Sequence, residues 1–261
     1  FDLRMASTVP LGAGLSSSAS FEVAVLRAIR EAFGLSLDDV KIALLGQKAE
    51  TDFVGAPIGV MDQMAASLAD TQNALMLDTR TLVFERVPLP AAIDLVVLNS
   101  GVTHSHAGGE YRTRRAECEA AASALGVRVL RDLSIADLSR IEKLPDAQCK
   151  RARHVVKENA RVLQFAAAMR AEDLSTLGAL LYEGHASLRD DFQVSVKEID
   201  LIVELARNTP GVYGARLTGG GFGGSVVIMT DAAAAKQAAQ SIAATYAEKS
   251  GRTPTVFTSR E

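Results

Sequence analysis

Apolar and polar residues alternate along the first third of the chain in a pattern that predicts helices between loops rich in glycine and serine. Apolar residues recur at helical spacing over 21–32, and Gly34 follows where a helix commonly ends. A second helix is predicted over 36–50, with Ser36 as its N-cap and an acid three residues later, as in a capping box. A third helix is predicted over 60–68, after a break that contains glycine and proline.

Strand patterns flank these helices. Residues 1–10 are expected to form a strand that leads into a loop, while 74–78 and 82–87 are expected to form a hairpin. Two prolines then interrupt the pattern, which indicates a domain boundary. We therefore predict two domains, residues 1–92 and residues 93–261.

The rest of the chain combines long helices with short strands. A capping box formed by Ser195 and Glu198 marks the expected start of one helix, and a run of glycines separates two of the strands. The predicted helices cover 109–125, 147–169, 174–188, 196–207 and 232–249, and the predicted strands cover 94–100, 215–218, 225–230 and 255–259. This pattern, with helices and strands in both halves, predicts an α+β fold.

Composition narrows the class of protein. The 28 Lys and Arg residues nearly balance 31 Asp and Glu residues, so a nucleic-acid partner is not expected. No apolar run is long enough to predict a membrane span, and the two cysteines predict no disulfide framework. We expect a soluble, cytoplasmic and monomeric protein. The chain begins at Phe1 rather than Met, inside a strand pattern, which predicts a fragment of a longer protein.

The loop before the first helix has the composition of an anion-binding site. Its glycines let the backbone approach a ligand closely, and three serines follow where a helix exposes unpaired N–H groups. A polyphosphate would suit this loop, as would a Mg²⁺ ion that takes oxygen ligands. A loop with ordinary serine caps explains the pattern equally well. The candidate phosphate-binding residues are Gly12, Ala13, Gly14, Leu15, Ser16, Ser17 and Ser18.

Two acids in the helical region are further candidates. Asp62 lies in an apolar helical stretch, where a carboxylate can orient or deprotonate a hydroxyl group. A surface acid favoured by the helix dipole is the stronger interpretation of this position from its pattern alone. Glu50 can bind a metal ion, although a solvated helix face also explains it.

Glycine occupies five of the six positions in 219–224. Because each glycine costs backbone entropy, a simple linker is a poor explanation, and a backbone that closes over a ligand is favoured. Gly219, Gly221 and Gly224 formally match a dinucleotide-binding fingerprint, but a strand rather than a helix is predicted to follow them. An NAD-dependent oxidoreductase is therefore a weak alternative.

Together, and in this order, these segments resemble the GHMP kinases. Residues 10–19 look like the second motif of that family, its phosphate loop, and residues 217–224 look like its third motif. Within the family, the segments 47–50, 59–63, 109–119 and 185–195 are similar to galactokinases. The resemblance covers essentially the whole chain. It implies a ribosomal-protein-like α/β domain followed by a ferredoxin-like domain, with the site between them.

The resemblance also implies a role for each candidate residue. The loop from Gly12 to Ser18 would wrap the phosphates of ATP, and Ser18 with Glu50 would hold Mg²⁺. Asp62 would be the catalytic acid residue that faces the anomeric hydroxyl of a sugar. The residues implied to line the sugar site are Gly59, Asp62, Tyr111 and Gly220.

Some features of the family lie outside the sequence. Its first motif, which supplies an arginine and sugar-binding acids, is expected before Phe1, so the isolated chain is expected to be poorly active. The family resemblance leaves other sugars open, such as N-acetylgalactosamine or arabinose. A non-catalytic sensor of sugar and nucleotide is also open, although the joint presence of Ser18, Glu50 and Asp62 argues against it.

Overall fold

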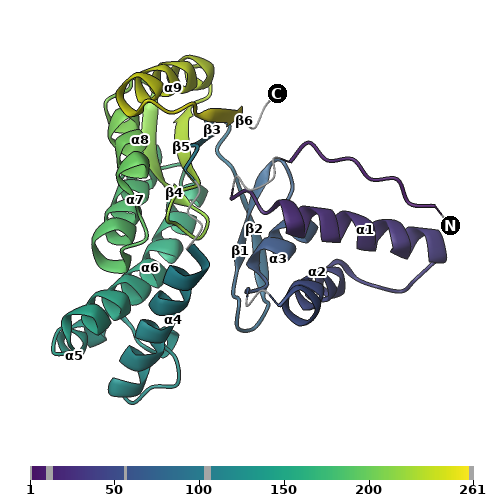
Figure 1. The fold of residues 1–261 in the computed structure, drawn as a ribbon, viewed down its shortest axis with the longest axis horizontal. Coiled ribbons are helices and arrows are strands. Elements are labelled where there is room, and N and C mark those ends of the chain that lie inside the picture. Colours follow the sequence, from purple (N-terminus) through teal and green to yellow (C-terminus); the bar gives the residue numbers. More distant parts are fainter. Residues whose placement is uncertain (1, 10–13, 56–57, 103–106, 259–261) are drawn as a thin grey trace. The chain divides into compact units, whose positions relative to one another are not determined.

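The computed structural model describes residues 2–9, 14–55, 58–102 and 107–258 (Figure 1). The chain divides into two compact units, Phe1–Leu89 and Pro90–Glu261. No helix within the described ranges has the length and apolar character needed to cross a membrane.

The first unit is built from three helices and a hairpin. Its buried apolar residues come mainly from α2 and α3, with leucines of the hairpin packed against them. Helices α1, α2 and α3 also contact one another directly, so each helix holds the other two in place. The elements are α1 (Ser17–Phe33), α2 (Asp39–Lys48), a π-helical turn (Ala49–Val54), α3 (Met61–Leu68), β1 (Asn73–Leu77) and β2 (Phe84–Pro88).

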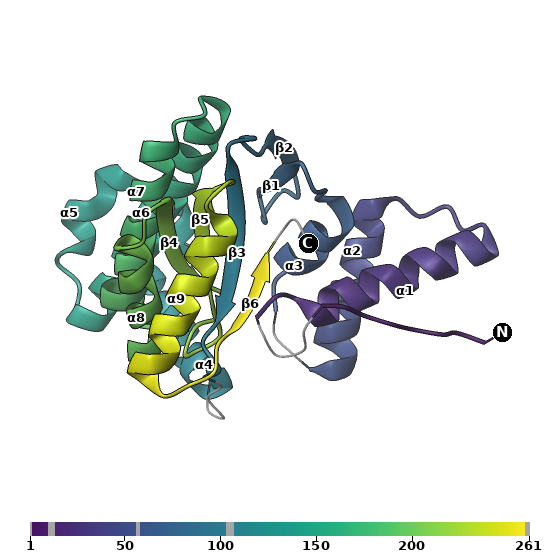
Figure 2. The same cartoon turned by 90° about the horizontal axis from the view of Figure 1, so that it is seen from above.

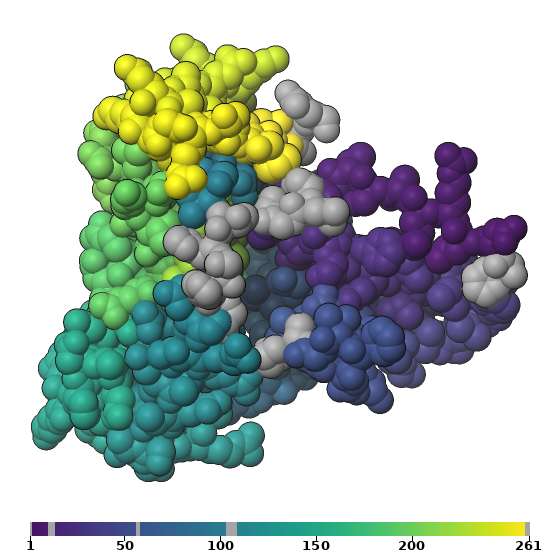
Figure 3. Space-filling view, viewed as in Figure 1, coloured from purple at the N-terminus to yellow at the C-terminus, as the bar shows by residue number. Residues whose placement is uncertain are grey.

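Two sequence predictions for this unit are wrong. Residues 2–9 are extended but form no strand, because no described strand pairs with them, and Figure 3 shows them as a narrow dark-purple strip on the surface. Ser36 does not cap the second helix. The helix starts at Asp39, and the Asp38 carboxylate accepts the hydrogen bond from the Lys41 N–H at 2.7 Å. Asp38 is the residue next to the helix, so its side chain alone reaches these amides.

The second unit contains a four-stranded antiparallel sheet with the strand order β4-β5-β3-β6 (Figure 2). Its strands are β3 (Ile93–Asn99), β4 (Val212–Thr218), β5 (Ser225–Asp231) and β6 (Thr255–Thr258). Its helices are α4 (Ala107–Ala124), α5 (Leu138–Ile141), α6 (Asp146–Arg170), α7 (Leu174–Ser187), α8 (Lys197–Arg207) and α9 (Ala235–Ser250). Short helical turns lie at Leu130–Asp132, Ile135–Asp137 and Leu188–Phe192.

Helices α8 and α9 cover one face of this sheet. Alternate strand residues, such as Val96, Leu98 and Ile228, are fully buried against them. Tyr246 of α9 is also fully buried, and its hydroxyl donates a 2.8 Å hydrogen bond to the Ser100 carbonyl. In β3 the alternation of buried and half-buried residues therefore marks the face that these helices cover.

The start of α8 differs from the sequence prediction. The helix begins at Lys197, and no side chain caps its first turn. The Ser195 hydroxyl instead donates a 2.6 Å hydrogen bond to Asp200, whose carboxylate also lies 3.1 Å from the Nε2 atom of His185. Because Ser195 lies two residues before the helix, its hydroxyl reaches Asp200, an acid of the first turn, rather than the backbone N–H groups of that turn.

Helix α7 packs unusually close to the edge strand β4. A Cβ atom added to Gly178 would lie 2.1 Å from the Tyr213 carbonyl oxygen, and one added to Gly214 would lie 2.7 Å from the Gly178 Cα atom. Glycine at both positions is therefore a condition of this helix–strand contact.

We expect Gly178→Ala to lower the free energy of unfolding by about 2 kcal/mol or more, because the strand backbone has to move. Intrinsic helix propensity alone predicts the opposite sign, since alanine in a helix is ordinarily more stable than glycine by about 1 kcal/mol. Gly109→Ala is the matched control, because Gly109 is also helical and its added Cβ would meet no atom within 4 Å. Urea unfolding of both variants tests this, and equal stabilities would contradict it.

His154 of α6 is buried beside the turn that follows α7. Its Nδ1 atom lies 2.9 Å from the Ser187 hydroxyl, and its ring stacks on Phe192 with centroids 4.5 Å apart. Burial lowers the pKa of His154 from 6.5 to about 4, despite the opposing charge of Glu158. The imidazole is therefore neutral in the folded protein at pH 7.

Because its pKa is lower in the folded protein, His154 should make stability sensitive to acid. The stability that neutral His154 contributes is fully present above pH 6.5. It is lost as the pH falls toward 4, because the unfolded chain binds the proton at a higher pH than the folded protein does. The wild type loses free energy of unfolding on acidification through His154, and we expect His154→Gln to abolish up to about 3 kcal/mol of that loss. Denaturant unfolding of wild type and variant at pH 7 and pH 4.5 measures the difference. If the stabilities of wild type and variant change equally between these two pH values, His154 does not have this role.

Candidate active site

The start of α1 exposes groups that suit an anion. Ser16 precedes the helix with left-handed backbone angles, φ 53° and ψ 42°, and its side chain does not cap the helix. The first turn contains no acid, so the positive end of the helix dipole is not neutralised by its own residues. The first turn therefore keeps its unpaired amides, and ordinary serine capping does not explain this loop.

The serine hydroxyls at this helix start are available for a ligand. Within the described residues, the side chains of Ser16, Ser17 and Ser18 form no hydrogen bond. Ser18 is exposed, and Ser16 and Ser17 are half-buried. Of the predicted phosphate-binding residues, Gly12 and Ala13 lie outside the described residues, whereas Gly14 is described and has a φ of 72°.

Glu50 lies in the π-helical turn after α2 and is half-buried. A second acid, Glu22 of α1, lies beside it, close enough for their side chains to interact by charge and hydrogen bonding. Glu22 is one helical turn beyond Ser18, so the two share a face of α1. Burial, with the nearby Glu50 charge, raises the pKa of Glu22, even though a hydrogen bond from Gln63 opposes the shift. The first unit therefore brings two carboxyl groups together near the helix start.

Asp62 lies in the first turn of α3 and is half-exposed. No described basic side chain forms an ion pair with it. The next residue, Gln63, is fully buried, and its Nε2 atom donates a 3.1 Å hydrogen bond to Glu22. This bond ties the start of α3 to α1, so Asp62, Glu50 and the serine-rich helix start all belong to one packed unit.

The glycine run of the second unit connects β4 to β5. Most of its glycines are required by the backbone: Gly219, Gly221, Gly223 and Gly224 all have positive φ. An added Cβ at Gly221 would lie 2.6 Å from Val194, and one at Gly223 would lie 2.4 Å from the Val102 carbonyl oxygen. The loop therefore packs closely against other residues of the second unit. This packing explains why most positions of the run are glycine, without a bound ligand.

Gly220 is the exception in this run. Its φ is not positive, and an added Cβ would meet no atom within 4 Å. Gly59 in the first unit is alike in both respects. At these two positions packing does not demand glycine, so close approach of a ligand remains a prediction. Because β5 follows the run directly, the dinucleotide-binding hypothesis is wrong.

Tyr111 lies on α4 with 46% of its surface exposed. One turn later, Arg114 donates a 3.2 Å hydrogen bond to the Gln193 carbonyl and lies 6.0 Å from the ring centroid of Phe222. Arg114 therefore connects the helix that presents Tyr111 to the loop that contains Gly220.

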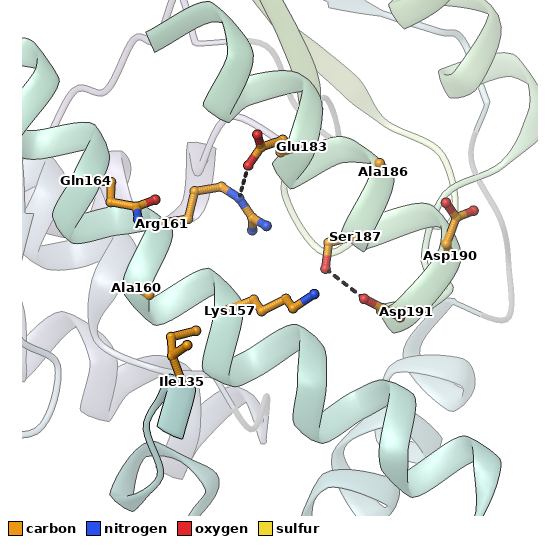
Figure 4. Close-up of a pocket in the computed structure, with 10 residues that line it drawn as sticks. All are labelled: Ile135, Lys157, Ala160, Arg161, Gln164, Glu183, Ala186, Ser187, Asp190 and Asp191. Carbon is orange, nitrogen blue, oxygen red and sulfur yellow. Dashed lines mark hydrogen bonds and ion pairs between the residues drawn. The ribbon is translucent and has the colours of Figure 1, made fainter. Parts of the chain in front are cut away.

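A separate cavity of about 660 Å³ lies in the second unit between α6 and α7 (Figure 4). Lys157 points into it, and Arg161 turns toward Glu183 at 3.9 Å. On its other side, the Ser187 hydroxyl donates a 3.4 Å hydrogen bond to Asp191. The cavity contains none of the predicted site residues, and its charges of both signs indicate no particular ligand.

Comparison with known families assigns the class. A model described as the GHMP kinases N terminal domain matches residues 1–70, and one described as GHMP kinases C terminal matches residues 165–248. These matches define a GHMP kinase, a family that uses ATP.

Individual relatives narrow this class. A galactokinase of Roseiflexus sp. is 44% identical over 99% of this chain and 68% of its own length. One of Streptomyces coelicolor is 44% identical over 98% of this chain and 67% of its own length. The chain therefore belongs to the galactokinases of the GHMP kinase family, and it spans about two thirds of the length of these relatives.

Solved structures agree on the fold. The chain matches Lactococcus lactis galactokinase, solved with galactose, at a TM-score of 0.90 and 32% identity, over 96% of this chain and 66% of that one. Mevalonate kinase of L. major matches at a TM-score of 0.62 and 22% identity over 93% and 65% of the two chains, which shows a shared fold. The predicted α+β GHMP kinase fold is confirmed.

Sequence reasoning missed Glu22 and Gln63. The spacing of Ser18 and Glu22 on one helix face was an available signal, but Glu22 alone resembles any exposed helical acid. Gln63 gave no signal, because only the packing of α1 against α3 makes it a partner of Glu22.

We expect Gly221→Ala to destabilise the protein and Gly220→Ala to leave its stability nearly unchanged. At Gly221 alanine would adopt a φ of 86° and collide with Val194, a combination expected to cost about 2 kcal/mol or more. At Gly220 there is open space, so the free energy of unfolding should change by less than about 0.5 kcal/mol. Thermal and urea unfolding measure both, and a large loss in Gly220→Ala would contradict this view of the loop.

Proposed function

We propose that the protein transfers the γ-phosphoryl group of ATP to the C1 hydroxyl of galactose, giving galactose 1-phosphate. The observation that supports this most is the helix start of α1, with unneutralised amides and unpaired serine hydroxyls, in a chain 44% identical to galactokinases. Phosphoryl transfer depends mostly on positioning and on stabilising the charge of the phosphate oxygens, and this helix start suits both tasks.

The loop from Gly12 to Ser18 is the proposed phosphate-binding segment. Amides at a helix N-terminus point toward an anion, and the helix dipole adds a partial positive charge there. Because the first turn of α1 contains no acid, nothing in that turn competes with a phosphate for these groups.

Ser18 and Glu50 are the proposed ligands of a Mg²⁺ ion that accompanies ATP. The donor set fits this ion: an exposed hydroxyl and a half-buried carboxylate supply oxygen, and a second carboxyl at Glu22 adds negative charge. No group of three or more acidic, histidine or cysteine side chains forms a metal cage within the described residues. One hydroxyl and one carboxylate suit Mg²⁺, because this ion usually keeps several waters and binds phosphate oxygens together with only one or two protein ligands. Bound there, the ion would neutralise phosphate charge.

Asp62 is the proposed catalytic residue, which orients the sugar hydroxyl and accepts its proton. Its carboxylate is half-exposed and has no described basic partner, so it is available to a hydroxyl group. The proposed sugar contacts are Gly59, Asp62, Tyr111 and Gly220.

We expect Asp62→Asn to lower kcat by about 10²–10⁴-fold, because the amide cannot accept the hydroxyl proton. The affinity for ATP should change little, since Asp62 is not among the phosphate-binding residues. Steady-state kinetics of the intact protein with galactose, together with calorimetric titration of a non-hydrolysable ATP analogue, measure both quantities.

Asp52→Asn is the matched control, because this acid of the same unit is exposed, and its described contacts are a 4.0 Å ion pair with Lys48 and a 3.3 Å hydrogen bond from the Thr51 hydroxyl. It should leave kcat unchanged. An Asp62→Asn enzyme with nearly full kcat would refute the catalytic role. Binding of sugar and nucleotide without turnover by the wild type would instead favour a sensor.

A further inference from the structure

Glu22 has an environment that a structural role does not explain. It lies on α1 with its carboxyl group beside Glu50, so two acids share one place in the first unit. A Cβ atom added to Gly46 of α2 would lie 3.2 Å from the Glu22 Oε2 atom and 3.2 Å from the Gln63 Cγ atom. The half-buried Glu22 side chain therefore places its carboxyl group beside residues of α2 and α3.

Gln63 holds this carboxyl and keeps unused hydrogen-bonding capacity. Its side chain is fully buried, and its Nε2 atom donates to Glu22 at 3.1 Å. Its Oε1 atom is also buried and has no hydrogen-bond partner among the described residues. A buried, unpaired amide oxygen is destabilising, so it indicates a site whose polar partner arrives from outside the protein.

No described cation balances the pair of acids. The only described side-chain groups that act on the Glu22 carboxyl are Gln63, which donates a hydrogen bond to it, and the second acid Glu50. A fold that keeps two carboxyl groups adjacent, with an amide fixing one of them, gains from this arrangement only when a cation joins it.

We propose that Glu22 and Gln63 are positioning residues for the divalent cation of the nucleotide complex, with Gln63 fixing Glu22 and Glu22 orienting Glu50. This inference rests on the proposed function, because it takes Glu50 as a ligand of that cation. Mg²⁺ keeps several waters when bound, and a carboxylate outside its direct ligands accepts hydrogen bonds from those waters. Glu22, one turn beyond Ser18, is placed for this task, and its hydrogen-bond donor Gln63 directly follows Asp62.

The test compares Glu22→Gln with the wild type in the intact protein, using Mn²⁺ as the metal probe and a non-hydrolysable ATP analogue. Electron paramagnetic resonance titration measures Mn²⁺ affinity in the ternary complex. We expect a 10–100-fold weaker Mn²⁺ affinity for Glu22→Gln, the range typical of lost outer partners of metal ligands. Binding of the analogue without metal should be unchanged or tighter, because one negative charge is removed.

Two further variants separate positioning from folding. Glu31→Gln is the matched control, since Glu31 is an exposed acid of the same helix whose described ion pair is with Arg30 at 3.1 Å, and it should retain wild-type Mn²⁺ affinity. Glu22→Asp keeps the charge and should restore part of the lost affinity. Urea unfolding should find Glu22→Gln as stable as the wild type or more stable, because a like-charge contact is gone.

The outcomes distinguish this inference from the proposed function. Wild-type Mn²⁺ affinity in Glu22→Gln, or a loss of stability that accounts for the weaker binding, would overturn the positioning role alone. A wild-type protein whose binding of the ATP analogue does not depend on metal would overturn the proposed metal site as well.

Discussion

The unpaired amides at the start of α1 are the feature on which the proposed site depends. A helix start attracts anions only where its own residues do not already satisfy or neutralise it, and here no side chain caps α1 and no acid lies in its first turn. The same helix carries Glu22 one turn later, beside Glu50. One helix therefore presents positive groups for phosphates at its tip and negative groups for a cation further along, which is the charge pattern that a metal–nucleotide complex requires.

The glycines of the second unit serve mainly to bring backbone segments into contact. Gly178 lets α7 lie against β4, and Gly221 and Gly223 let the glycine run lie against Val194 and Val102. Arg114 then connects this loop to the helix of Tyr111. The proposed sugar contacts in this unit thus rest on close backbone packing, while an alanine Cβ at Gly220 itself would meet no atom within 4 Å.

Local sequence patterns predicted the types of most helices and strands. They failed where a residue far away in the sequence determines the local structure. Helical spacing located most of the helices, because that signal comes from burial of one face, while β3 was located as an apolar run and β5 as a strand beside the glycine run. Residues 2–9 have a strand pattern but no described pairing strand. Ser36 and Ser195 resemble caps, although α2 begins three residues after Ser36 and α8 begins two residues after Ser195. Among site residues, the sequence predicted the serine-rich loop, Glu50 and Asp62, and their roles remain predictions. It could not identify Gln63, whose role arises only when α3 packs against α1.

The central claim is that the start of α1 and Glu50 together hold the metal–nucleotide complex, with Asp62 facing the sugar. A crystal structure of the intact protein with galactose, Mg²⁺ and a non-hydrolysable ATP analogue tests it most directly. The account predicts the analogue's phosphates on the amides that follow Gly14, with Mg²⁺ about 2.1 Å from oxygen atoms of Ser18 and Glu50. It also predicts the Asp62 carboxylate within hydrogen-bonding distance of the sugar's C1 hydroxyl. Phosphates bound away from α1, or an Asp62 side chain directed away from the sugar, would contradict it.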